Sequence, residues 1–357
     1  MKILAPHTIL QISLEGISFS LLLLLLMACN NRDSFEFRPQ YGKGIQSEVD
    51  ENYRQVDSVI TQLQKASNVS DQIDSLIVFA DKILNIDELA ALNYASAANK
   101  LATEKNQILE RGISFYYLSL ILGRREFDQS GIDRPFFYGQ FSYRLFRAEA
   151  NPYWQALALS QIGDLFRRQA ALDSARTYYQ HSLRLVESGQ ILPKDSLRLR
   201  ADLIHSMGML AFSEEDFEQA DQYYQQSDSI YAILADPSAF LRLKSNQGLL
   251  LLSQERYAEA DSVLQLGLSF GIQARDNNGL ERIYEMLSFL RFFQYAAGDG
   301  GAQYFEEAIA YAKQGLGKAA KNQHVFYHQM GLVYQQKLTF VGTKEERITV
   351  SDSALQN

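Results

Sequence analysis

Apolar or small side chains recur every three or four positions along most of this chain, beginning near Glu48. The clearest segment shows this spacing at Ala175, Tyr178, Tyr179, Ser182, Leu183 and Val186. Such spacing puts these residues on one face of an α-helix, whereas a half-buried strand would alternate at every second residue. No long alternating run is present, and the six prolines lie outside the clearest periodic segments, at Pro6, Pro39, Pro135, Pro152, Pro193 and Pro237. The pattern therefore predicts helices separated by turns.

Three of the helical blocks share small and bulky residues at fixed offsets. Each has a glycine, an alanine twelve residues later, a bulky residue four beyond the alanine, and a small residue three further on. In chain order the sets are Gly163, Ala175, Tyr179 and Ser182; Gly208, Ala220, Tyr224 and Ser227; and Gly248, Ala260, Leu264 and Gly267. This regular recurrence indicates an internal repeat.

The repeated glycine indicates close packing between two helices. Glycine inside a helix costs about 1 kcal/mol relative to alanine, so its recurrence at one position points to a steric need. We expect a second helix to press against it, with the alanine at the contact and the bulky residue beside it. The later small residue would then admit the next hairpin. Because one hairpin cannot bury its apolar face alone, neighbouring hairpins are expected to stack into a continuous core.

These blocks resemble tetratricopeptide repeats, whose helix-turn-helix units carry glycine, alanine and aromatic residues at this spacing. The resemblance implies an all-α fold, a right-handed superhelical solenoid of helical hairpins. It is clearest over Ala156–Ala274, where the repeats exceed the usual period of about 34 residues. Weaker units flank this region, marked upstream by Ala90, Tyr94 and Ala97, and downstream by Phe289 in place of glycine, Phe305, Ala308 and Gly331.

The N-terminal segment carries an apolar run that ends at a cysteine. The run from Ile17 to Ala28 is shorter than the roughly 20 residues that a membrane span needs. The order Leu26-Met27-Ala28-Cys29 resembles the lipobox of bacterial lipoproteins, and this resemblance implies cleavage before Cys29 and lipidation of its thiol. An ordinary cleaved signal peptide and an uncleaved membrane anchor remain alternatives.

The chain accordingly divides into four expected parts. These are a lipoprotein signal peptide (1–28), a flexible tether (29–47), degenerate N-terminal helical repeats (48–150) and a tetratricopeptide repeat array whose last unit is incomplete (151–357). Asn30, directly after the cysteine, is compatible with sorting to the outer membrane in the lipoproteins that the segment resembles. We therefore expect a protein of the bacterial cell envelope, held on the membrane by lipid on Cys29 and facing the periplasm.

Charge and composition argue against several function classes. The 357 residues include 34 Lys+Arg against 42 Asp+Glu, a net charge of -8, which disfavours a nucleic-acid partner. Cys29 is the single cysteine, so no disulfide or thiol nucleophile is expected elsewhere. His324 and His328 are four residues apart on an expected helix, but no third ligand accompanies them. We expect no catalytic residues, no metal, no cofactor and no small-molecule substrate.

The candidate that remains for function is a surface. In the proteins that this chain resembles, the first helices of successive repeats line a concave groove that binds a peptide or a partner helix. Residues three before and one after each repeat glycine face that groove. The resemblance thus implies a partner-binding groove that includes Ser160, Asp164, His205, Ser245 and His328 at these offsets. Arg167 and Arg242 are expected near the same wall of the groove. This set lacks the Lys and Asn constellation with which chaperone-binding members clamp a terminal carboxylate.

Two functions fit these features. The first is a non-enzymatic protein-protein interaction scaffold, anchored by lipid in the cell envelope, which binds another envelope protein or peptide through its concave face. The alternative is the sensory N-terminal part of a tetratricopeptide-repeat transcriptional regulator or histidine kinase. Fold analogy does not decide between them, because one fold supports many functions.

Overall fold

The computed structural model describes residues 68–84, 87–125, 133–297, 302–319 and 323–340, and within them it contains thirteen α-helices and no strand. The helices are α3 (Val69–Ile83), α4 (Glu88–Glu104), α5 (Ile108–Arg125), α6 (Asp133–Ala148), α7 (Pro152–Arg168), α8 (Leu172–Glu187), α9 (Pro193–Ser213), α10 (Phe217–Leu234), α11 (Pro237–Ser253), α12 (Tyr257–Ala274), α13 (Asn277–Ala296), α14 (Ala302–Leu316) and α15 (Gln323–Phe340). The segments predicted as signal peptide and tether, together with Cys29, lie outside the described residues. No helix of the described part is both long enough and apolar enough to span a membrane.

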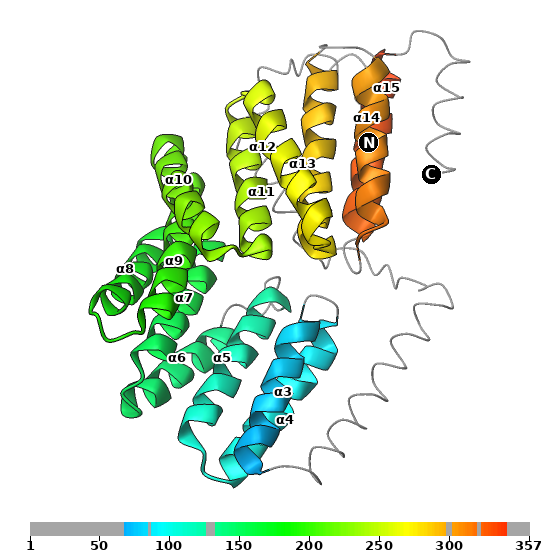
Figure 1. Ribbon diagram of the computed structural model, residues 1–357. Helices are drawn as coiled ribbons and strands as arrows, with labels where there is room; N and C mark the ends of the chain where they lie inside the picture. The colour runs from blue at the N-terminus through cyan, green and yellow to red at the C-terminus, as the bar shows by residue number, and fades with distance from the viewer. Residues whose placement is uncertain (1–67, 85–86, 126–132, 298–301, 320–322, 341–357) are drawn as a thin grey trace, which may run out of the picture.

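Consecutive helices pack as hairpins that follow one another along a curved path (Figure 1). The pairs are α3/α4, α5/α6, α7/α8, α9/α10, α11/α12 and α13/α14, and α15 packs against α14 and α13. The first helix of each pair also contacts the first helix of the next pair, so α3, α5, α7, α9, α11 and α13 form a continuous layer. This confirms the predicted all-α, right-handed superhelical solenoid of tetratricopeptide-like hairpins.

Prolines and short polar residues set where the first helices begin. Pro152, Pro193 and Pro237 each occupy the first turn of a helix, where the missing N–H leaves no internal hydrogen bond unmade. Asp236 caps α11 by accepting a hydrogen bond from the backbone N–H of Ala239 at 3.1 Å, and Asp276 caps α13 by accepting one from Gly279 at 2.9 Å. The prolines are therefore helix starts, as their exclusion from the periodic segments predicts.

The repeat glycines lie where the second helix of each hairpin comes closest. A Cβ placed on Gly163 would lie 2.6 Å from Cε1 of Tyr179, and one on Gly208 would lie 2.6 Å from Cε1 of Tyr224. In the third block a Cβ on Gly248 would lie 2.5 Å from Cδ2 of Leu264. The predicted contact between glycine and second helix is confirmed, and the bulky residue of the repeat is the group that makes it.

The later small residue of each block lies at a close helix contact, but only Gly267 of the third block makes the predicted contact with the next hairpin. The hydroxyl of Ser182 donates to the carbonyl of Ala156 at 2.7 Å, and the hydroxyl of Ser227 donates to the carbonyl of Ala201 at 3.1 Å. In the third block a Cβ on Gly267 would meet Cδ1 of Ile283, on the next hairpin, at 2.8 Å. Small side chains here therefore allow helices to approach closely within one hairpin and between neighbouring hairpins.

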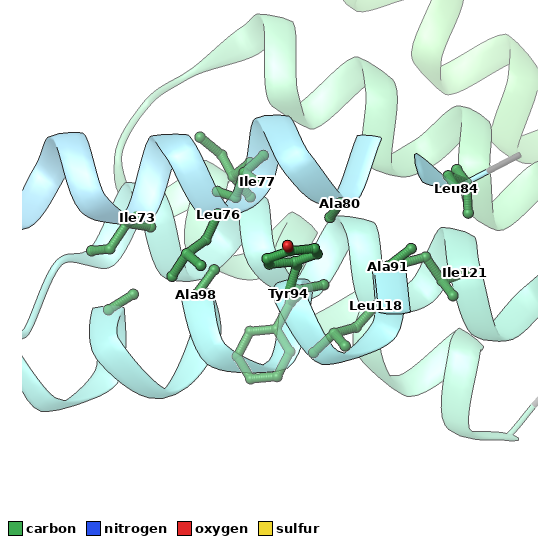
Figure 2. Packing of buried hydrophobic residues seen from close by; sticks show 14 of the residues in the cluster. Ile73, Leu76, Ile77, Ala80, Leu84, Ala91, Tyr94, Ala98, Leu118 and Ile121 are labelled. Carbon is green, nitrogen blue, oxygen red and sulfur yellow. The ribbon is translucent and has the colours of Figure 1, made fainter. Parts of the chain in front are cut away.

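The weaker upstream unit forms a packed hairpin. Ala90 and Tyr94 on α4 are buried as expected, and Figure 2 shows the Tyr94 ring among aliphatic side chains such as Leu76. The third position needs correction: Ala97 is half-buried, whereas Ala98 is fully buried in this core. Ala97 packs against the edge of this core, and the following alanine lies inside it.

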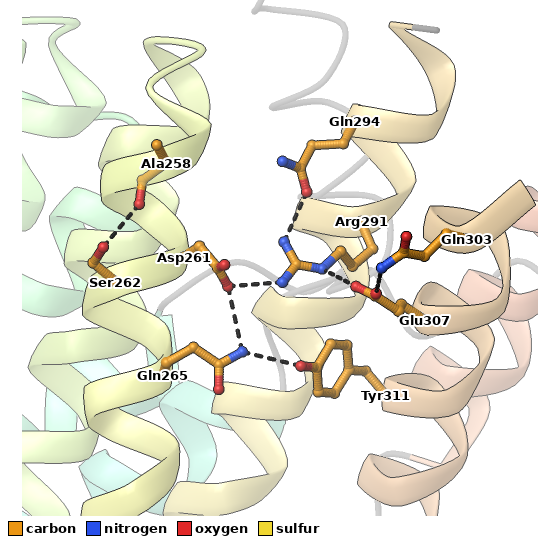
Figure 3. A network of polar contacts seen from close by, with 9 residues as sticks. All are labelled: Ala258, Asp261, Ser262, Gln265, Arg291, Gln294, Gln303, Glu307 and Tyr311. Atoms are coloured by element: carbon orange, nitrogen blue, oxygen red, sulfur yellow. Dashed lines mark hydrogen bonds and ion pairs between the residues drawn. The ribbon is translucent and has the colours of Figure 1, made fainter. Parts of the chain in front are cut away.

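The downstream units use other means to pack. Phe289 replaces the repeat glycine and is buried, with its ring stacked on Phe293. Arg291 ties three helices together, as Figure 3 shows. Its Nη2 donates to Asp261 on α12 at 2.9 Å, and its Nε donates to Glu307 on α14 at 2.6 Å. Because Arg291 is only 8% exposed, this network takes part in the packing of the unit.

Candidate functional site

Charged and hydroxyl side chains on the first helices of several repeats interact electrostatically with one another. Tyr116 on α5 shows this reach, because burial and Tyr117 raise the pKa of its hydroxyl and the carboxylates of Asp164 and Asp202 raise it further. These two aspartates belong to α7 and α9. We call the interacting set the inner face. Its members are Tyr116, Arg124, Asp164, Arg167, Arg168, Asp202, Arg242, Arg282 and Glu285.

An aspartate, a tyrosine and an arginine form the first polar cluster of the inner face. The hydroxyl of Tyr179 donates to Oδ1 of Asp164 at 2.6 Å, and Nε of Arg167 lies 3.8 Å from the same oxygen. That Nε is buried without a hydrogen-bond partner among the described residues. Burial acts to lower the pKa of Arg167, but Tyr179 and Asp164 outweigh it and the pKa lies above its usual value. The guanidinium is thus a held positive charge with donor capacity left over.

A second cluster of the same composition joins α9, α10 and α11. Oδ1 of Asp202 accepts hydrogen bonds from the hydroxyl of Tyr231 at 2.6 Å and from Nη2 of Arg242 at 2.8 Å. The side chain of Arg242 remains 44% exposed. Burial would lower its pKa, but Asp202 and Tyr231 raise it above the usual value. Two neighbouring repeats therefore each present an arginine held in place by an aspartate.

His205 is not at the surface, which corrects its assignment to an open groove. Its ring is 1% exposed and makes edge contacts with Tyr224 and Tyr231. The amide of Asn246 lies 2.7 Å from Nε2 and donates to it. Burial first, and then Arg242 and Arg167, lower the pKa of His205 well below its usual value. A neutral histidine enclosed by aromatic rings supports the packing of α9 on α11 and does not reach a partner.

The other predicted groove residues have mixed positions. Ser245 is 7% exposed, so it too is buried and its assignment to the groove surface is corrected. Ser160 on α7 is half-buried, and His328 on α15 is exposed. The structure thus brings Asp164, Arg167 and Arg242 together on the inner face and removes His205 and Ser245 from it. The offset rule fails at His205 because Tyr224 and Tyr231 of the second helix cover this position.

Several members of the inner face were missed by the sequence reasoning. Asp202 was missed, although it lies six residues before its repeat glycine, at the same offset as the predicted Arg242, and the two side chains are in contact. Comparison of the aligned blocks at this offset could therefore have identified Asp202 from the sequence. Arg124, Arg168 and Arg282 share no offset, so their proximity had no signal in the repeat pattern. Among the described residues, no group of three or more His, Cys, Asp or Glu side chains could hold a metal ion.

Comparisons with known proteins give similarities at the level of structure. No protein-family model matches the sequence, and the search of curated proteins gives no match. The apo form of the quorum sensor NprR from B. thuringiensis superposes with a TM-score of 0.58 at 15% identity, covering 87% of this chain and 83% of that one. NprR in complex with its cognate peptide NprX gives a TM-score of 0.55 at 18% identity, covering 87% of this chain and 83% of that one.

A third solved structure has the same arrangement of helices. It is a Rap protein complexed with Competence and Sporulation Factor, with a TM-score of 0.55 at 10% identity, covering 83% of this chain and 80% of that one. At these identities the likeness shows the fold, a tetratricopeptide-like solenoid that extends over most of both chains. The roles of individual residues are not transferred by it.

Proposed function

We propose that this chain is a protein-interaction scaffold whose inner face binds a segment of another polypeptide. The observation that carries the proposal is the pair of Asp–Tyr–Arg clusters on neighbouring repeats. In each cluster an aspartate holds an arginine, Arg167 or Arg242, with donor capacity that the cluster does not use. Groups held in this way lose little conformational entropy when a ligand binds, which favours recognition of backbone carbonyls and side chains.

The solved structures support a polypeptide as the first ligand class to test. NprR is described in complex with its cognate peptide, and the Rap protein in complex with a named factor. Each has the solenoid fold of this chain, which offers an inner layer of first helices along several repeats. We expect an extended segment or a single helix to lie along that layer and contact more than one repeat.

Selection of peptides from a random display library tests this function. The full chain, purified in detergent, would serve as the target, and the affinity of selected peptides would be measured by fluorescence anisotropy. Replacement of Arg167 and Arg242 by Gln should weaken binding by about tenfold or more, because charge-assisted hydrogen bonds are lost. A matched pair, Arg144→Gln with Arg184→Gln, changes two exposed arginines on α6 and α8 and should leave affinity unchanged. Equal affinity for both variants, or no selected peptide, would refute the proposal.

We also propose that the chain is anchored in the bacterial cell envelope through lipid on Cys29, at the outer membrane. The support is the order Leu26-Met27-Ala28-Cys29, since two or more acyl chains hold a protein on a bilayer. Metabolic labelling with a fatty-acid analogue in a bacterial host tests the anchor. Label should enter the native chain and be absent from Cys29→Ala. If neither form is labelled, the segment is an ordinary signal peptide or a membrane anchor.

A sensory role is the second candidate, favoured by the structural likeness to NprR, which is described as a quorum sensor. It requires the same ligand-binding inner face and adds an output region. Determination of the coding sequence beyond codon 357 separates the two roles, because a regulator would continue in frame into a DNA-binding or kinase region. A stop codon directly after Asn357 would instead favour the scaffold.

A further inference from the structure

Three arginines, two from neighbouring repeats and one from a repeat farther along the curve, lie close enough for their charges to interact. Arg124 belongs to the last turn of α5, Arg168 is the last residue of α7, and Arg282 lies in the second turn of α13. Figure 1 shows that the curved path of the hairpins returns α13 toward the end of α5. The positive charge of Arg282 lowers the pKa of both Arg124 and Arg168, although α13 lies four repeats after α5 along the curve.

The position of Arg168 is set by a direct contact with α5. Its Nη1 donates to the carbonyl oxygen of Gly123 at 3.2 Å, which places the guanidinium beside the turn that carries Arg124. The two helices are close here, because a Cβ on Gly123 would lie 2.6 Å from Cδ2 of Leu165 on α7. The first two members of the cluster are therefore neighbours by hydrogen bonding as well as by charge.

The third member, Arg282, is exposed at its tip but surrounded by the inner face. It lies near the N-terminus of α13, where the helix dipole disfavours a positive side chain. No hydrogen bond or ion pair of its guanidinium is found among the described residues. Its guanidinium therefore has donors available for a ligand.

The three charges repel one another. Burial first, and then the charges of Arg168 and Arg282, lower the pKa of Arg124 to about 10. Burial and Arg167 lower the pKa of Arg168, and Arg282 adds to this effect. Burial and Arg242 lower the pKa of Arg282. A positive potential built up in this way attracts an anion, whose arrival would relieve the repulsion.

Nearby carboxylates act against this potential. Glu88 raises the pKa of Arg124, and Asp164 raises the pKa of Arg168. The pKa of Arg282 is raised by three carboxylates, those of Glu285, Glu281 and Asp276. Asp164 is already engaged by Tyr179 and Arg167. Burial raises the pKa of Glu285 to about 7, so near neutral pH this carboxyl is partly protonated and weakly neutralising.

We propose that Arg124, Arg168 and Arg282 form a carboxylate-binding site that selects polypeptide segments with an aspartate or glutamate at one position. The inference rests on the proposed function, since it specifies which polypeptides the inner face takes. Guanidinium groups offer paired N–H donors that match the two oxygens of a carboxylate. Because the cluster joins α5 and α7 to α13, an acidic side chain bound here would contact repeats that are far apart along the curved path.

Peptide selection on the full chain also tests this site. Peptides selected by the native chain should share an Asp or Glu at one aligned position. Replacement of that residue by Asn or Gln, or Arg282→Gln in the protein, should weaken binding by about tenfold or more. The two changes together should cost little more than either alone. Arg282→Lys keeps the charge but not the paired donors, so its affinity should lie between those of the native chain and Arg282→Gln, whereas Arg184→Gln should retain all of the affinity. Arg282→Gln should keep or raise the thermal midpoint, because it relieves repulsion.

The outcomes separate this inference from the proposed function. If selected peptides lack an acidic position, or Arg282→Gln binds like Arg184→Gln, the carboxylate site is refuted. The proposed function then stands as long as the Arg167/Arg242 variant still loses affinity. If inorganic phosphate displaces acidic and neutral peptides equally well, the cluster binds free anions and the site is likewise refuted. If no peptide is selected, both proposals fail.

Discussion

The ring of Tyr179 occupies the space beside Gly163, with Cε1 2.6 Å from the position that a Cβ on Gly163 would take. Tyr179 is fully buried, and its hydroxyl donates to Asp164 on the inner face. One side chain therefore packs the two helices of a hairpin together and holds a charged residue of the candidate site. Packing and binding are coupled at this tyrosine.

Gly163→Ala should destabilise the fold for this reason. The added methyl would overlap a buried ring, and overpacking of this kind costs about 1–3 kcal/mol, more than the gain of about 1 kcal/mol in helix propensity. Urea unfolding followed by circular dichroism measures the difference. Gly331→Ala is the matched control, because a Cβ there meets nothing within 4 Å, and it should be neutral or stabilising. Equal effects of the two substitutions would contradict the packing argument.

Ala170→Gly should stabilise the turn of the same hairpin. Ala170 has φ of 57°, and the corresponding turn residues Glu215 and Glu255 have φ of 61° and 58°. An L residue in this left-handed region is strained, so glycine should raise the free energy of unfolding by about 0.5–1 kcal/mol. Ala170→Val should lower it, because a β-branched side chain tolerates this region least. Thermal melts that rank Val above Gly would contradict the prediction.

Arg291→Gln should loosen the junction of α12, α13 and α14. It removes the partner of both Asp261 and Glu307 at a position that is 8% exposed. The expected loss is about 1–3 kcal/mol, since two carboxylates lose charge-assisted hydrogen bonds. Arg256→Gln breaks an exposed pair with Glu259 and should have little effect on stability, because solvent screens exposed charges. Hydrogen exchange of α13 and α14 should rise in the first variant only.

Glu285 should make stability depend on pH. Burial raises its pKa to about 7 from the usual 4.5, so the native state keeps a proton that the unfolded chain has lost. The contribution of protonated Glu285 to the free energy of unfolding is therefore fully present below the unfolded pKa, and it is lost as pH rises through about 7. Glu285→Gln should match the native chain in mild acid and exceed its thermal midpoint in mild alkali. Parallel melting curves at all pH values would show that Glu285 titrates normally.

The repeat pattern was sufficient to predict how each hairpin packs. Gly163 with Tyr179 and Gly208 with Tyr224 lie at fixed offsets, because helical periodicity determines which side chains meet between two helices joined by a short turn. The same reasoning was off by one residue in α4, where Ala98 takes the place of Ala97. Without a glycine to mark the contact, a small rotation of the helix is enough to change which alanine is buried.

The groove residues were harder to predict. Asp164, Arg167 and Arg242 lie on the inner face, but His205 and Ser245 are covered. An offset within one repeat predicts the direction in which a side chain points. It does not predict whether side chains of a neighbouring helix cover it. His205 is enclosed because Tyr224 and Tyr231 of α10 extend over it, which depends on the spacing between helices.

The sequence by itself thus determined the helical class, the hairpin repeat and the packing partners of the repeat glycines, all of which follow from local periodicity. Only the tertiary structure decided that the charge of Arg282 lowers the pKa of Arg124, although the two residues lie four repeats apart along the curve. Such proximity results from many small rotations between successive hairpins, each set by side-chain packing, and their sum is not encoded at any one position.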